Sequence, residues 1–163
     1  MNDPTADPAD HAAVARLLGR EPLGRFSVAA RRPDGQPMVI VNEPLLRDGS
    51  PMPTRFWLVD PDICAVVARL ESHGGVKEAE NEIEPALIAD AHARYAQLRD
   101  VHLPVDWVGP RPSGGVGGTR QGVKCLHAHV AWWLTGGDDP VGRWVADRIG
   151  LSRGAALCDD SKS

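Results

Sequence analysis

The sequence predicts an α+β fold, in which a small three-stranded antiparallel sheet packs against four to five helices. Three observations predict this class. Apolar residues alternate with polar or small ones on both sides of "RPDG" (32–35), which is typical of a β-hairpin. Beyond residue 60 the apolar residues recur at helical spacing. The length of 163 residues is typical of one domain.

The N-terminal part of the chain predicts one helix followed by the sheet. Residues 8–19 place Ala13, Leu17 and Leu18 on one helical face, and Gly19 ends the helix. A hairpin follows, and a further turn leads to a third strand. The hairpin and the third strand are predicted because apolar and polar side chains alternate in both. The hairpin spans residues 24–44 and the third strand spans residues 54–60.

The rest of the chain predicts helices separated by glycine and proline. Asp60 stands where a helix cap is expected, with Pro61 at the first helical position. A longer helical segment is broken or kinked near Pro85. The helix 123–134 is apolar nearly all round, so we expect it to be central and buried. The predicted helical segments here are 60–72, 76–100, 123–134 and 138–150.

We expect one α+β domain over residues 8–150, between a flexible N-terminus (1–7) and a disordered tail (151–163). The chain has 18 basic and 22 acidic residues, so its net charge of −4 gives no general attraction for nucleic acid or membranes. We therefore expect the protein to bind neither nucleic acid nor membranes. The sequence does not identify a protein partner.

The cysteines and the apolar runs predict where the chain resides. Cys64, Cys125 and Cys158 form no disulfide framework, and free thiols suit a reducing cytoplasm. No apolar run approaches the roughly 20 residues that span a bilayer. We therefore predict a cytoplasmic protein.

The stretch "GVKCLHAH" (122–129) holds one cysteine and two histidines. If the stretch were a strand, the side chains of Cys125, His127 and His129 would all lie on one face. The segment 123–134 lies between glycines and contains no turn residue, which favours a helix by its length. On a helix, Cys125 and His129 share a face, and His127 points to another part of the core.

A glycine-rich loop (113–124) precedes this helix and predicts an anion site. Backbone N–H groups and the helix dipole favour phosphate or carboxylate at a helix N-terminus. The alternative is a flexible surface loop with two solvated cations. The candidate ligand-binding residues are Gly117, Gly118, Thr119, Arg120, Gly122 and Lys124.

The same region offers candidates for metal and thiol chemistry. Cys125 and His129, one helical turn apart, could hold zinc or another divalent metal, with His92 as a third ligand. For catalysis the candidates are Cys125, His127 and His92, because a thiol needs a neighbouring base. The alternative is a buried thiol among histidines that are hydrogen-bonded in the core. These residues do not by themselves establish that a cofactor is bound.

Several segments together resemble a bacterial family that is common in actinobacteria, the domain of unknown function number 501. The motifs that carry the resemblance are "LLGREPLGRFSVAARR" (17–32), "DGSPMPTRFWLVDP" (48–61), "ARLES" (68–72), "AHARYAQLRD" (91–100) and "VKCLH" (123–127). The resemblance implies a single-domain intracellular protein without an assigned activity. It also implies cysteines in the hairpin turn and after the third strand of many members, where this chain has Arg32, Asp34 and Asp60.

Three functions remain open. The residues favour binding of a small anionic ligand at the loop 113–124, with Cys125, His127 and His92 lining the pocket or behind it. One alternative is a metal-assisted or Cys-dependent enzyme of hydrolysis or phosphoryl chemistry at the same pocket. The other is a non-enzymatic module that contacts a protein through its tryptophans. We expect Glu71 to form an ordinary surface pair with Arg69.

Overall fold

The structure, a computed structural model, describes residues 6–153 and confirms the α+β class. Three strands form one antiparallel sheet in the order β1-β2-β3, and six α-helices pack around it within the described residues. The elements are α1 (Pro8–Leu18), β1 (Gly24–Arg31), β2 (Pro37–Leu46), β3 (Phe56–Leu58), α2 (Pro61–Ser72), α3 (Gly75–Glu82), α4 (Pro85–Asp100), the 3₁₀ turn η1 (Val116–Gly118), α5 (Leu126–Leu134) and α6 (Pro140–Ile149).

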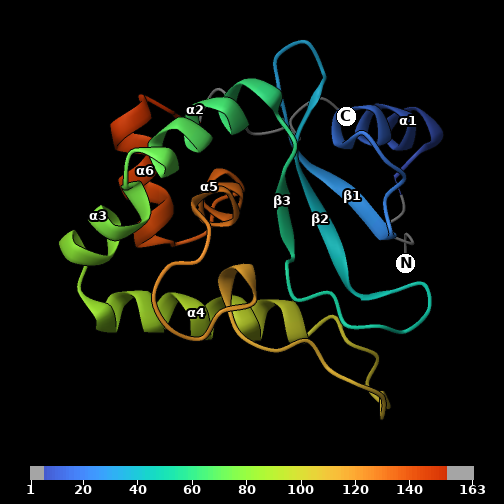
Figure 1. Cartoon of the computed structure of the whole chain (residues 1–163). Helices are drawn as coiled ribbons and strands as arrows, with labels where there is room; N and C mark the ends of the chain where they lie inside the picture. The colour runs from blue at the N-terminus through green and yellow to red at the C-terminus, as the bar shows by residue number, and fades with distance from the viewer. Residues whose placement is uncertain (1–5, 154–163) are drawn as a thin grey trace.

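The two faces of the sheet are covered by different helices. Helix α1 lies against one face, while α2 to α6 lie on the other side (Figure 1). Strand side chains alternate between these faces. In β3, Trp57 packs with a small apolar cluster that includes Val14 of α1, whereas Phe56 and Leu58 pack with the larger core that contains α5.

Helix α5 occupies the centre of the larger core, as predicted. Figure 1 shows it enclosed by α2, α4, α6 and β3. All of its residues are buried except His127 and Trp133, which are partly buried. A helix that is apolar all round has no polar face to expose to solvent, so its composition explains its burial.

The helix boundaries follow proline and glycine. Asp60 accepts hydrogen bonds from the backbone N–H groups of Asp62 and Ile63 and so caps α2, as predicted. The predicted break near Pro85 separates α3 from α4 completely, because Ile83 is extended and Glu84 (φ −59°, ψ 133°) is not helical. The break explains why the described residues contain six α-helices where four to five were expected.

Short pieces of the predicted flexible ends are held in place. The backbone N–H of Ala6 donates to Phe26, and Asp7 caps α1. At the other end, Leu151 bonds back to Ala146, and the Arg153 guanidinium lies over the Trp133 ring. The remainder of both predictions, residues 1–5 and 154–163, lies outside the described residues.

Two buried polar side chains of α4 fix the chain around the site. The Tyr95 hydroxyl accepts hydrogen bonds from the backbone N–H groups of Arg55 (2.6 Å) and Phe56 (3.1 Å), at the start of β3. The Arg99 guanidinium, only 1% exposed, donates to the carbonyls of Pro53 and Gly114. Helix α4 thus ties β3 and the glycine-rich loop together.

Candidate functional site

Three polar side chains from two elements converge beside the start of α5. Glu71 comes from the last turn of α2, Cys125 directly precedes α5, and His127 lies in its first turn. The His127 Nδ1 atom lies 3.1 Å from Glu71 Oε1 and 3.7 Å from Cys125 Sγ. One ligand atom from each side chain lies within 4.8 Å of the others, so this Glu71–Cys125–His127 group could hold a metal ion.

Backbone contacts orient two members of the group. The other ring nitrogen of His127, Nε2, lies 3.2 Å from the carbonyl oxygen of Cys64 and donates to it. This bond leaves Nδ1 as the nitrogen that faces Cys125 and Glu71. Glu71 Oε1 also accepts a hydrogen bond of 2.8 Å from the backbone N–H of Leu126, the first residue of α5.

The group also changes the acid–base properties of His127. The hydrogen bond with Cys125 raises the pKa of His127 to about 9, and the negative charge of Glu71 contributes in the same direction. Nearby, burial raises the pKa of the Cys64 thiol to about 11. Cys64 therefore stays a thiol, and its Sγ donates to the Leu58 carbonyl at 3.5 Å.

A groove of about 460 Å³ lies next to the group, between β3 and the start of α5. Lys124, Cys125 and His127 supply polar atoms to it, and no ion pair within residues 6–153 engages Lys124. The other lining residues are Thr54, Phe56, Trp57, Leu58, Gly117 and Ala128. The volume falls within the range of roughly 300–1,000 Å³ that is usual for small-molecule sites.

The structure separates Cys125 from the other two predicted metal ligands, His129 and His92, whose ring centroids lie 5.7 Å apart. The helical argument that put Cys125 and His129 on one face is wrong, because Cys125 is extended (φ −150°, ψ 121°) and α5 begins only at Leu126. Cys125 therefore contacts His127, the residue expected to point away from it.

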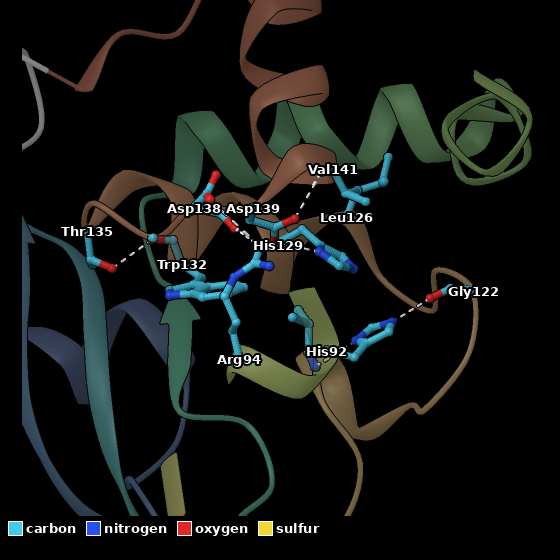
Figure 2. A network of polar contacts seen from close by, with 12 residues as sticks. His92, Arg94, Gly122, Leu126, His129, Trp132, Thr135, Asp138, Asp139 and Val141 are labelled. Atoms are coloured by element: carbon cyan, nitrogen blue, oxygen red, sulfur yellow. Dashed lines mark hydrogen bonds and ion pairs between the residues drawn. The ribbon is translucent and has the colours of Figure 1, made fainter. Parts of the chain in front are cut away.

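His129 and His92 instead form a buried network of their own (Figure 2). His129 Nδ1 donates to Asp139 Oδ2 at 2.6 Å, and its Nε2 has no partner within the described residues. His92 Nε2 donates to the Gly122 carbonyl at 2.7 Å, and its Nδ1 accepts from the backbone N–H of Val116. Both His92 nitrogens are thus occupied, and His92 supports the loop.

Only two of the six predicted anion-binding residues, Gly117 and Lys124, line the groove. Gly118 lies against Pro53, and Arg120 is exposed. Thr119 and Gly122 both use their carbonyls within the protein, Thr119 for the N–H of Gly115 and Gly122 for His92.

The protein's own carboxylates occupy N–H donors where an outside anion was expected. Glu71 accepts from Leu126, and Glu80 accepts from the backbone N–H of Val123 at 2.8 Å. The expected surface pair of Glu71 with Arg69 is absent from the described residues. The contacts of Glu71 and Glu80 join α2 and α3 to residues at and just before the start of α5, far along the sequence, and periodicity carries no signal for them.

Arg32 and Asp60, two of the positions where the resemblance implies cysteines in many members, contact each other. Arg32 Nε lies 2.5 Å from Asp60 Oδ2, and its Nη2 lies 2.7 Å from Asp60 Oδ1. The Asp60 side chain is fully buried, and the paired carboxylate raises the pKa of Arg32 further. An ion pair therefore joins the hairpin turn to the start of α2 in this chain.

Fold and site together define an α+β protein with a potential metal-ligating group beside a groove. The chain belongs to the family described as "Protein of unknown function (DUF501)", whose model matches residues 28–147, and this confirms the resemblance. The matched range contains all three residues of the Glu71–Cys125–His127 group. No curated protein and no solved structure matches the chain. None of the described helices combines the length and the apolar character that a bilayer crossing requires.

Proposed function

We propose that the Glu71–Cys125–His127 group binds a zinc ion, and that the remaining coordination position takes a small anionic ligand in the groove. The convergence of a thiol and a carboxylate on one imidazole nitrogen carries the proposal. A single N–H could serve only one of these two neighbours well, whereas a metal ion would bond to all three.

The distances fit a zinc ion. With Zn–S near 2.3 Å, Zn–N and Zn–O near 2.05 Å and tetrahedral angles, sulfur and nitrogen stand roughly 3.6 Å apart, and nitrogen and oxygen roughly 3.3 Å. The corresponding separations are 3.7 Å and 3.1 Å. The third pair, the Cys125 sulfur and a Glu71 oxygen, lies within 4.8 Å.

The surroundings of the group support the same reading. Histidines that bind metals usually donate their second nitrogen to a carbonyl or carboxylate, as His127 does to Cys64. A thiolate, an imidazole and a carboxylate are the three ligand types that zinc accepts in proteins. Three protein ligands with one position left open is the pattern of zinc sites that exchange ligands.

The anion would bind in the groove because both Lys124 and the proposed zinc face it. Lys124 lines the groove together with Cys125 and His127. A negative ligand in the fourth position would contact the metal and be paired with this ammonium group. The proposed anion site is therefore the groove beside the C-terminal end of the glycine-rich loop, whereas the sequence predicted a site on the backbone of that loop.

Cobalt(II) in place of zinc tests both parts. Cobalt bound by a thiolate absorbs in the near ultraviolet through sulfur-to-metal charge transfer, and its visible bands report the other ligands. We expect this charge-transfer band in the wild-type protein, its loss in Cys125→Ser, and its retention in the matched control Cys64→Ser. Inorganic phosphate should shift the visible bands. A band that survives in Cys125→Ser contradicts the zinc group, and visible bands indifferent to phosphate contradict the anion site.

A further inference from the structure

We infer that the groove selects organic oxyanions: carboxylates or phosphate monoesters that carry an apolar group about the size of a phenyl ring. This inference rests on the proposed zinc group, and it adds the class of ligand that the groove takes. Three features lead to it: the two unlike walls of the groove, the charge of Lys124 and the volume of the groove.

The wall formed by the start of α5 is polar. Lys124 and Cys125 directly precede α5, His127 lies in its first turn, and all three line the groove. Lys124 is exposed and joins no ion pair within the described residues, so its charge is available to a ligand. This wall therefore suits an oxyanion head group.

The wall formed by β3 is apolar. Phe56 and Leu58 stand two residues apart on a strand, so their side chains project to the same side of the sheet, toward α5. Ala128, the third residue of α5, completes the wall. A small side chain at Ala128 leaves room beside the two larger ones, and an apolar group inserted there would displace water from apolar surface.

The volume separates an organic anion from a bare one. The groove encloses about 460 Å³, whereas one water takes roughly 30 Å³ of liquid volume. An inorganic phosphate, with five heavy atoms, would leave most of the groove filled with water against Phe56 and Leu58. A ring attached to the head group would fill that space. Burying a phenylalanine-sized group typically favours binding by roughly tenfold or more.

Calorimetric titration of the zinc-loaded full chain tests the inference. The ligands are compared in pairs that share a head group: phenyl phosphate with inorganic phosphate, and benzoate with acetate. We expect the aromatic member of each pair to bind at least tenfold more tightly. Equal affinities within both pairs would overturn the inference.

Two variants assign the contributions of the walls. Leu58→Ala should weaken phenyl phosphate several-fold and leave inorganic phosphate unchanged, while Leu45→Ala, a partly buried leucine of β2 outside the groove, should leave both unchanged. Lys124→Gln should weaken both phosphates about equally, with Lys77→Gln as the exposed-lysine control. A loss in Leu58→Ala that is equal for both phosphates contradicts the apolar wall.

The results keep this inference apart from the proposed function. If zinc binds and inorganic phosphate binds as well as phenyl phosphate, the ligand class is wrong and the proposed function stands. If no zinc binds, the proposed function is wrong, and the inference that rests on it is overturned as well. Should Leu58→Ala fail to fold, the comparison of paired ligands on the wild-type protein still decides the matter.

Discussion

Removing the Asp139 carboxylate should destabilise the fold far more than removing an ordinary helix cap. Asp139 Oδ1 accepts the backbone N–H of Val141 at 2.9 Å and caps α6, while Oδ2 accepts from His129 at 2.6 Å. Both partners of the second bond are fully buried (Figure 2). Asp139→Ala therefore removes a cap and also leaves a buried ring N–H without an acceptor.

The two losses can be given magnitudes. Loss of an N-cap costs about 1 kcal/mol. A buried hydrogen bond to a charged group contributes about 1.5–3 kcal/mol. We expect Asp139→Ala to lower the free energy of unfolding by about 3 kcal/mol, and Tm by about 6–12 °C for a domain of this size.

The matched control is Asp7→Ala, because Asp7 caps α1 through the backbone N–H of Asp10 at 2.8 Å and has no buried imidazole as a second partner. Its expected cost is about 1 kcal/mol. Urea unfolding of both variants gives the comparison. If Asp139→Ala costs no more than Asp7→Ala, the bond between His129 and Asp139 does not stabilise the core and the reasoning is refuted.

Two further predictions concern the buried polar groups of α4. Tyr95→Phe removes the acceptor of two buried backbone N–H groups, those of Arg55 and Phe56, and should cost about 2–4 kcal/mol in urea unfolding; a loss below about 1 kcal/mol would show that these groups find other partners. Burial lowers the pKa of His92, with the charge of His129 acting in the same direction and that of Asp139 opposing it. Because the unfolded chain then binds the proton more readily, the contribution of neutral His92 to stability should be complete above about pH 6.5 and should decrease as the pH falls below it. The His92→Gln variant should show a smaller decrease between about pH 7 and pH 5, and an equal decrease in both proteins would contradict this assignment.

Local signals in the sequence were sufficient to predict most of the fold. The "RPDG" turn joins two alternating segments, and these became β1 and β2. Asp60 followed by Pro61 marks the start of α2, and Pro85 separates two helices. Each of these features acts within a few residues of itself, so a single sequence contains the necessary information.

The composition of the site depends on contacts that no local pattern contains. Helix α5 starts at Leu126 and not at Val123, because Glu71, 55 residues earlier, accepts the Leu126 N–H. That shift of three residues leaves Cys125 extended and turns it toward His127. The prediction placed the helix correctly and its first turn incorrectly, so it paired Cys125 with His129, whereas Cys125 contacts His127.

The anion prediction shows the same limit. Two residues of the loop, Gly117 and Lys124, line the groove. The sequence could not show that Glu71 and Glu80 reach the N–H groups of Leu126 and Val123. Intramolecular carboxylates of this kind satisfy the donors that a helix start offers to a ligand.

The zinc content of the protein tests the central claim most directly. The full chain is purified under reducing conditions without a metal-chelating resin, incubated with zinc, dialysed, and analysed by atomic spectrometry. We predict about one zinc per chain in the wild-type protein and in His73→Ala, an exposed-histidine control, and a loss of most of it in His127→Ala and Glu71→Ala. Wild-type protein that retains no zinc, or His127→Ala protein that retains as much as the wild type, would contradict the zinc site.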